Sequence, residues 1–581
     1  MATETILSPG VLLQETDKSF ITPGVDPSGM AIIGPTARGP INVPTVIKNY
    51  DEFKQIFGTT IKNGTQREEY FTNLSVKYYF ENGGASALVT RVATGSWGAA
   101  SSTTIDANLA ANDDCFTLET LGVGTVFNTT TAAGVASVEY DNGAFKSGSK
   151  DNVKWEIKDI NANQGTFTLI VRRGDDRPSA PIVLESFTEC SLDPLSDNYI
   201  AKKVGDQLSS ASLDSETGDY LIDVSGEFPN KSKYIRVTAV NSPTYNYLND
   251  VTNLSGSLPT AQSGGFHGGI GDNLSTTAAN NRFGSSSGTS DTNIQGLGSG
   301  NYDIAISLLK NKDEFKFKTL VIPGLNQDTH ASTIDTVIEN TTARGDSFFV
   351  TDLEVWGASV TEATEEAGDL DTSFATSYYP WVQVYSTELN KNIWCPASTI
   401  IPGVYAKNDS LAAPWFAPAG ESRGKLGRLV TGVEKKLSKG SRDTLYSNKI
   451  NPIASFPDTG LVVFGQKTLQ NAKSALDRVN VRRMLLDVKD TISGFADNIL
   501  FENNTEQTRD RFVRQVTPYL ESLVQRQGLY AFQVKMDGQN NTPDIIDENK
   551  LVGQVFLQPT KTAEFIVLDF TLTPTGASFT D

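Results

Sequence analysis

The sequence predicts a multidomain protein of mixed α+β and α/β class, in which one α/β region is interrupted by a β-rich insertion. Length is the first observation, because 581 residues correspond to three or four domains at about 150 residues each. The second is an alternation of helical and strand patterns before residue 95 that returns near residue 300. The third is the stretch between them, where short β-like runs lie among many Thr, Ser, Asn and Gly residues.

The overall charge and composition exclude several classes of function. Apolar residues make up 38% and charged residues 20% of the chain, which is typical of a folded protein and not of a disordered chain. The formal net charge of −19 argues against direct nucleic-acid binding and against an anionic membrane surface, because both need a positive face. No run approaches 18 apolar residues, so no membrane insertion is expected.

The chain contains few of the residues that catalytic sites commonly use. The chain has two His and three Cys residues that lie far apart, so neither a disulfide framework nor a zinc site is expected. Residues 284–288 match G-x-S-x-G, but their low-complexity flanks replace the strand and helix that a nucleophile elbow needs. Arg344-Gly345-Asp346 is interpreted as a structural feature before a strand. We therefore expect no cofactor, no metal and no enzymatic activity.

The first 95 residues predict an extended arm and then a compact β-α-α-β unit. Residues 1–25 form the arm, because residues 6–15 are extended in character and Pro9 cannot donate to a strand ladder. Asn49 and Glu52 predict a helix N-cap. The elements expected in chain order are a strand at 29–36, a helix at 49–58, a helix at 71–82 and a strand at 85–93.

Residues 96–300 predict the β-rich insertion, with strands around 153–157 and 165–171. Residues 263–300 are nearly all Gly, Ser, Asn and Thr, which favours a long mobile loop or linker. An ordered, irregular surface loop is the alternative.

From residue 301 the order of helix and strand is typical of βαβ units. The elements expected over 301–450 are a helix near 304–309, a strand at 318–322, a helix at 334–340 and a strand at 347–353.

The C-terminal part predicts two amphipathic helices and three strands. Leu469, Ala472, Leu476 and Val479 mark one helical face, which continues after a break through residues 485–499. The second helix spans 512–523, where Pro518 is expected to cause a kink or a local break. The strands are expected at 529–536, 552–557 and 564–573, and the last of these alternates in a way that suits a half-covered strand.

Two further features concern association with other molecules. Residues 420–450 hold eight Lys or Arg against three Asp or Glu, which indicates either a handle for an acidic partner or a solvated mixed-charge face. Both ends of the chain are typical of edge strands. Unpaired N–H and C=O groups there offer a template for another chain, or the two ends pair with each other.

The chain resembles the contractile tail sheath proteins of myophage-type bacteriophages. The resemblance rests on short motifs that occur in the family order over more than 500 residues and spare most of the insertion. The motifs include LSPGV (7–11), FENGG (80–84), YYPW (378–381), WFAPAG (415–420), VNVRR (479–483), FENN (501–504) and AEFI (563–566). The chain departs from the family at residues 465–468, where GQKT stands in place of Gly-Ala-Arg-Thr.

The resemblance implies a structural subunit that forms stacked hexameric rings in a helical array around a tail tube. Its domains would be an N-terminal arm for strand exchange (1–25), a discontinuous assembly core that begins at 26–95, β-rich outer domains (96–300), a middle α/β domain (301–450), an inner assembly domain (451–560) and a C-terminal arm (561–581). On host contact, the sheath would contract and drive the tube through the envelope. Its partners would be copies of itself, the tube protein, the baseplate and the tail terminator, in a virion tail assembled in the host cytoplasm.

The resemblance also implies the residues that would meet neighbours. Interface residues in the N-terminal arm would be Ile6, Leu7, Val11, Leu12 and Leu13. Those in the C-terminal arm would be Phe565, Ile566, Val567, Leu568, Phe570 and Leu572. Basic residues that face the tube would be Lys467, Lys473, Arg478, Arg482 and Arg483. Two alternatives stay open, namely the sheath of a non-phage contractile injection system and, more distantly, an enzyme with a β-rich insertion.

Overall fold

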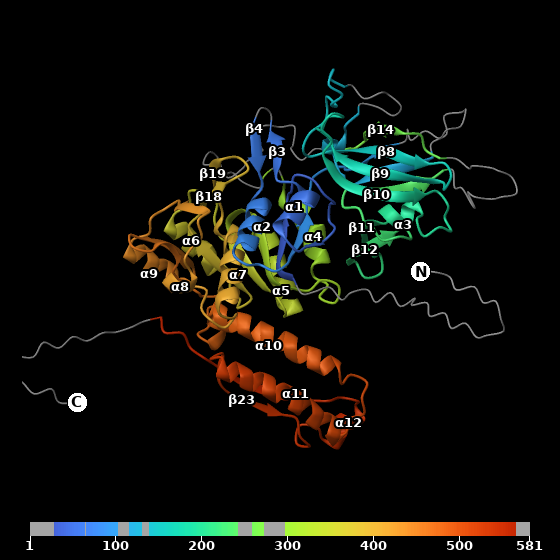
Figure 1. Cartoon of the computed structure of the whole chain (residues 1–581). Helices are drawn as coiled ribbons and strands as arrows, with labels where there is room; N and C mark the ends of the chain where they lie inside the picture. Colours follow the sequence, from blue (N-terminus) through green and yellow to red (C-terminus); the bar gives the residue numbers. More distant parts are fainter. Residues whose placement is uncertain are drawn as a thin grey trace, which may run out of the picture.

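The computed structural model describes residues 28–63, 66–102, 115–130, 139–241, 258–271, 295 and 297–564. They form an α/β domain around a large sheet, a β-rich insertion on one side of it, and a C-terminal region of two long helices with a small sheet (Figure 1). The mixed α/β class with several sheets, predicted from the sequence, is confirmed.

The α/β domain is built on an eight-stranded sheet whose strands come from both sides of the insertion. The strands in spatial order are β2 (Thr45–Ile47), β5 (Ala87–Arg91), β1 (Ser28–Gly34), β15 (Phe317–Asn326), β16 (Phe348–Asp352), β17 (Ala375–Tyr379), β21 (Asn451–Phe456) and β22 (Gly460–Val463). The middle six are parallel, and β2 and β22 are antiparallel edges. Met30 of β1 is paired with both Ala87 and Thr319, so segments more than 200 residues apart share one ladder.

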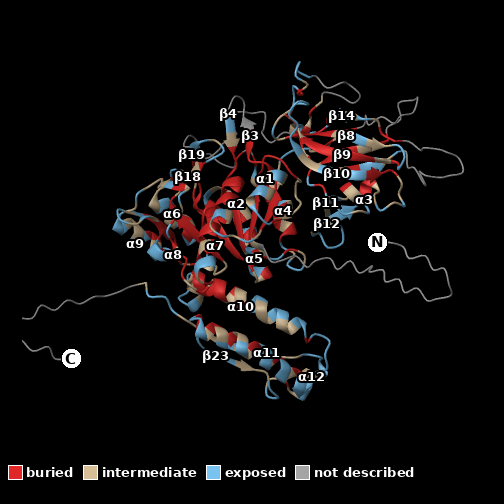
Figure 2. Cartoon of the chain, in the orientation of Figure 1, coloured by how far each residue is buried: buried red, intermediate tan, exposed pale blue. Residues whose placement is uncertain are grey.

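Helices cover both faces of this sheet, and alternate residues of β1 face different layers. Met30 and Ile32 join one cluster, and Ala31 and Ile33 join the other, as the two-residue repeat of a strand requires. The first layer holds α1 (Tyr50–Phe57), α2 (Phe71–Glu81) and α7 (Ile401–Leu411). The second holds α4 (Asp303–Leu308), α5 (Gln327–Arg344), α6 (Val360–Gly368) and α9 (Lys439–Ser447). Figure 2 shows buried residues concentrated in the sheet and on the helix faces against it.

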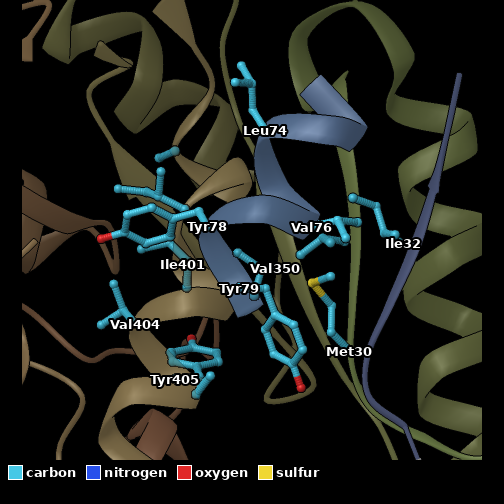
Figure 3. Close-up of a cluster of buried hydrophobic side chains, with 14 of the residues drawn as sticks. Met30, Ile32, Leu74, Val76, Tyr78, Tyr79, Val350, Ile401, Val404 and Tyr405 are labelled. Carbon is cyan, nitrogen blue, oxygen red and sulfur yellow. The ribbon is translucent and has the colours of Figure 1, made fainter. Parts of the chain in front are cut away.

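Local sequence signals explain the first helices. The Asn49 side chain caps α1 by accepting from the Glu52 N–H at 2.8 Å, as predicted, and Gly58 ends the helix with a φ of 69°. In α2, Tyr78 points towards α7 beside Ile401 and Val404 (Figure 3). Gly403 allows this approach, because a Cβ there would lie 2.4 Å from Cδ1 of Tyr78.

Small elements lie around this frame. They are the hairpin β3 (Thr60–Asn63) and β4 (Gln66–Glu69), the helix α8 (Gly420–Arg423), and the three-stranded sheet of β18 (Val382–Ser386), β19 (Lys391–Cys395) and β20 (Val430–Val433).

The insertion has a hydrophobic core of its own, which includes Phe116, Trp155 and Phe167. One sheet runs in the order β10-β9-β8-β14, a second in the order β13-β7-β6, and β11 and β12 form a separate hairpin. The elements are β6 (Ala99–Ser102), β7 (Phe116–Val123), β8 (Val153–Asn161), β9 (Thr166–Arg173), β10 (Val183–Ser191), α3 (Ile200–Val204), β11 (Leu208–Leu213), β12 (Tyr220–Ser225), β13 (Ile235–Val240) and β14 (Gln262–Gly264).

The prediction of a mobile loop over 263–300 is wrong for residues 263–271, and also for 297–300, where Leu297 is buried and a 3-10 turn begins at Ser299. Phe266 has no exposed surface and belongs to the core of the insertion, and residues 98 and 101 form bridges with Ile270 and His267. The amino-acid composition did not predict this order, because only one buried aromatic side chain and a few backbone hydrogen bonds hold the segment in position. Residues 272–294 and 296 lie outside the described residues.

Buried arginines join the insertion to the α/β domain. Arg38 donates to the carbonyl of Asp151 at 2.7 Å and to that of Gln55 at 2.8 Å, so its guanidinium connects both regions. The fully buried Arg91 donates to the carbonyl of Gly39 and, at 3.4 Å, to that of Val123 in β7 of the insertion. These hydrogen bonds satisfy charges that would otherwise be costly to bury.

The C-terminal region consists of α10 (Val479–Asp497), α11 (Glu506–Gln525), β23 (Leu529–Lys535), α12 (Pro543–Asp547) and β24 (Gln554–Pro559). The buried faces of α10 and α11 form a separate cluster with Phe512 and Val516. The helix α11 continues past Pro518 to Gln525, so this proline does not break it.

The helix predicted over Leu469–Val479 is wrong before residue 475. Leu469 donates its N–H to the carbonyl of Ala375 in β17 at 3.0 Å, and Lys467 forms a bridge with Arg478. These contacts hold the chain against the start of β17. Only a short 3-10 turn at Ala475–Asp477 precedes α10.

Candidate subunit interface in the C-terminal region

The β23–β24 hairpin is a two-stranded sheet with both outer edges open among the described residues. Its strands are antiparallel, with Gln533 opposite Phe556. The inner face packs Phe532 and Leu557 against the helices. The outer face leaves Tyr530 64% exposed and Phe556 53% exposed. Because unpaired N–H and C=O groups line an open edge, each edge is a template for a further strand.

After β24 the chain follows a course held by hydrogen bonds. Thr560 donates its N–H to the carbonyl of Gly528 at 3.2 Å and its hydroxyl to that of Gln527 at 2.9 Å. The Asn480 side chain, in the first turn of α10, donates to the Thr562 hydroxyl at 3.3 Å. Residues 560–564 are therefore docked on the subunit.

Glu564 is the last described residue, and three side chains hold its carboxylate; we call this set the Glu564 clamp. Arg478 donates to it from Nε at 2.7 Å and from Nη2 at 2.9 Å. The Tyr446 hydroxyl donates at 2.7 Å and the Gln466 amide at 3.1 Å. Two parallel N–H···O bonds from one guanidinium fix direction as well as distance.

The electrostatics of the Glu564 clamp favour the charged carboxylate. Burial alone would raise the pKa of Glu564, but the hydrogen bonds from Arg478 and Tyr446 outweigh it, so this pKa lies below its usual value. Burial, together with the carboxylate, raises the pKa of Tyr446. Tyr446 therefore stays a hydrogen-bond donor.

A groove of about 790 Å³ runs between residues 559–564 and the segment that leads into α10. Its polar lining includes Lys449, Lys467, Lys473, Asp477, Arg478 and Lys561. Lys449 donates to the carbonyls of Ala367 and Leu370, so this cation is already engaged within the subunit.

Contacts inside the subunit engage two of the predicted tube-facing residues. Lys467 donates to the carbonyl of Tyr446 at 2.6 Å and lies over its ring, and burial lowers the pKa of Lys467. Arg478 belongs to the Glu564 clamp. Lys473 is exposed on the rim of the groove.

Arg482 and Arg483, also predicted to face the tube, are buried in the subunit. Arg482 is 3% exposed and lies 3.4 Å from the centre of the Phe374 ring, and burial lowers its pKa to about 10. Arg483 is 8% exposed and forms an ion pair with Asp409. Both side chains point into the subunit, because they lie on the buried face of the first turn of α10.

The predicted arm residues lie outside the described residues. This holds for Ile6, Leu7, Val11, Leu12 and Leu13, and for Phe565, Ile566, Val567, Leu568, Phe570 and Leu572. The second set follows directly after Glu564 in the chain. Sequence reasoning missed Tyr446, Gln466 and Glu564 as one group. The available signal was that Glu564 falls in the AEFI motif, whereas Gln466 lies in the GQKT stretch where the chain departs from the family.

Other motifs have structural roles. Arg344 donates to the carbonyls of Leu309 and Phe315 and pairs with Asp346 just before β16. In the described ranges, no three His, Cys, Asp or Glu side chains gather as metal ligands. No described helix is long and apolar enough to cross a bilayer.

Comparison with known proteins agrees with this architecture. Residues 298–469 match the phage tail sheath protein central domain, and residues 471–573 match the phage tail sheath C-terminal domain. The tail sheath protein of Vibrio phage KVP40 is 35% identical over 37% of this chain and 32% of its own length. That of Enterobacteria phage T4 is 31% identical over 40% of this chain and 35% of its own length. The matches thus span about a third of these relatives.

The fold extends the likeness beyond the matched domains. The crystal structure of a sheath tail protein from Listeria innocua superimposes with a TM-score of 0.53, over 93% of each chain at 10% identity. At 10% identity the superposition shows a similar fold and carries no information about function. The family likeness comes from the two domain matches: between residues 298 and 573 the chain is similar to the central and C-terminal domains of phage tail sheath proteins.

Proposed function

We propose that this protein is the structural subunit of a bacteriophage contractile tail sheath. It polymerises as stacked hexameric rings around the tail tube, and contraction of the sheath drives the tube through the host envelope for genome ejection. The observation that carries the proposal is the β23–β24 hairpin, which has two open edges among the described residues and lies in the region that matches the phage tail sheath C-terminal domain. The curated relatives favour a phage tail over a related injection system, because they are phage proteins.

Strand addition provides the link between subunits. Each hairpin takes up the N-terminal arm of one neighbour and the C-terminal arm of another, which completes a four-stranded sheet shared between chains. Main-chain ladders then persist while the bodies of the subunits rotate around the arms. The energy of contraction is stored in an extended lattice that is separated from the contracted one by a kinetic barrier.

The remaining partners follow from the same role. The tube protein contacts the inner assembly domain, and the baseplate and the tail terminator meet the ends of the lattice in a virion tail assembled in the host cytoplasm. The role is structural and non-catalytic, without bound cofactor, nucleic acid or membrane insertion. Of the five basic residues proposed to face the tube, Lys473 is the exposed one. Weak, salt-screened contacts of this kind suit a tube that is held before firing and released afterwards.

The test is assembly of the purified chain, followed by negative-stain electron microscopy and light scattering over a range of concentrations. We expect hollow cylinders from the wild type and from Leu568→Val, which keeps every backbone donor. Leu568→Pro removes one ladder donor and should leave folded subunits without cylinders, as should deletion of residues 1–20. Cylinders from both disrupted variants at the wild-type concentration would contradict strand exchange.

A further inference from the structure

The Glu564 clamp connects three parts of the subunit at one carboxylate. Tyr446 belongs to α9, Gln466 follows the edge strand β22, and Arg478 is the residue that precedes α10. The donors lie between 2.7 and 3.1 Å from the carboxylate oxygens. The contacts of Thr560 and Thr562 lead the chain to this point. The chain is therefore held in place up to Glu564, the last described residue.

We infer that Glu564 and its three partners are positioning residues, which aim the C-terminal arm at the neighbouring subunit and couple it to the α/β domain. This inference rests on the proposed strand exchange. It adds the anchored segment, residues 560–564, that precedes the exchanged strand and that we call the root of the arm. It also assigns Arg478 a role inside the subunit in place of a tube contact.

Ordering before association is the first reason for this role. A segment whose root is already held loses less conformational freedom when it joins another chain, so association is more favourable. Without the clamp, the last contact before the arm would be that of Thr562, and residues 563 and 564 would have to be ordered at the same time as the strand.

Transmission of displacement is the second reason. The hairpin that precedes the arm is only two-stranded and packs on the C-terminal helices. The clamp adds side chains from α9 and from the edge of the eight-stranded sheet. A displacement of the neighbour that holds the arm is therefore passed to the α/β domain and not to the hairpin alone.

The test compares assembly thresholds of full-length variants by light scattering, with electron microscopy of the product. Glu564→Ala removes every acceptor of the clamp and should raise the threshold concentration about tenfold. Glu564→Gln keeps one acceptor oxygen and should fall between Glu564→Ala and the wild type. Tyr446→Phe removes one hydroxyl without a change of charge and should raise the threshold about threefold. Lys561→Ala, an exposed residue of the same segment, is the matched control and should stay within about twofold.

A second readout follows the root of the arm in the unassembled subunit. Amide hydrogen exchange of residues 560–564 should become faster in Glu564→Ala and not in Lys561→Ala, while the melting temperature of the subunit stays within about 2 °C. Exchange that is unchanged in Glu564→Ala, or assembly of that variant at the wild-type threshold, would overturn the positioning role.

The outcomes separate this role from the proposed function. If deletion of residues 565–581 abolishes cylinders while Glu564→Ala forms them normally, the sheath proposal stands and the positioning role falls. If the wild type forms no polymer, alone or with the tube protein, the sheath proposal falls and the positioning role falls with it.

Discussion

Arg483, in the first turn of α10, forms an ion pair with Asp409 near the end of α7, with 2.5 Å between Nη2 and Oδ2. Its guanidinium also lies 4.4 Å from the centre of the Tyr405 ring, and the Tyr405 hydroxyl is 2.8 Å from that of Tyr378 in β17. One buried side chain thus joins the C-terminal region to the helices and the sheet of the α/β domain. The N-terminal end of the long helix α10 is therefore fixed to the α/β domain.

Asp409→Ala should destabilise the interface between the C-terminal region and the α/β domain. It leaves the buried guanidinium of Arg483 without its carboxylate, and loss of one partner of a buried ion pair costs about 3 kcal/mol. Chemical denaturation checks this value. Lys318→Ala is the control, because its ion pair with Asp487 joins the same helix at an exposed position and should cost at most about 1 kcal/mol. Equal effects of the two variants would contradict the assignment.

Gly403→Ala should destabilise the packing of α7 on α2. The new methyl group would overlap the Tyr78 ring and approach its carbonyl oxygen at 3.0 Å, and overpacking of this kind costs about 1–3 kcal/mol. Gly494→Ala, in the exposed half of α10, meets no atom within 4 Å and should stabilise the protein by up to about 1 kcal/mol through helix propensity. Thermal unfolding of both variants measures the contrast, and a stabilising Gly403→Ala would refute the close approach.

Phe266→Ala should weaken the insertion without affecting the sheet of the α/β domain. Phe266 is fully buried, and removal of a buried Phe costs about 3–5 kcal/mol. Ile270→Ala is the control in the same segment, because Ile270 is 60% exposed and should change stability by less than about 0.5 kcal/mol. Hydrogen exchange should locate the loss in β8 and β14. A loss spread over the whole chain would contradict a separate core.

Glu354→Gln should change how stability depends on pH. Burial and the nearby charges of Asp328 and of the α6 glutamates raise the pKa of Glu354 to about 8, from about 4.3 in an unfolded chain. The wild type therefore loses stability as the pH rises from about 4.3 to 8, because the unfolded chain releases its proton first.

The glutamine variant lacks this loss, so it should melt about 2–4 °C above the wild type at pH 8 and close to it at pH 5. Thermal unfolding across this range is the measurement, with the exposed Glu365→Gln as control. A difference from the wild type that does not change with pH would refute the burial of a titrating Glu354.

Local patterns predicted the first elements of the α/β domain, up to β16, but none of those between residues 354 and 450. The cap at Asn49, the apolar run of β1 and the turn after α2 are each encoded within about ten residues, and the structure has them as predicted. The face that begins with Leu469 failed for a physical reason. Its apolar side chains have helical spacing, but its backbone pairs with the distant strand β17, and tertiary pairing overrides local propensity.

The candidate interface was harder to predict, because it depends on pairs that are distant in sequence. Arg478 and Arg482 were assigned together to a basic face towards the tube, yet one holds Glu564 and the other lies over Phe374. A charge count does not show whether an arginine is exposed, since a guanidinium can be buried against a ring or a carboxylate. Glu564 stands at the start of an apolar run, and no spacing connects it with Tyr446 or Gln466.

A cryo-electron microscopy map of the assembled polymer tests the central claim most directly. The account predicts that β23 and β24 each pair along their open edge with a strand from another subunit, one from residues 1–25 and one from residues 565–581. A polymer in which the hairpin stays two-stranded, or pairs with the termini of its own chain, would contradict it.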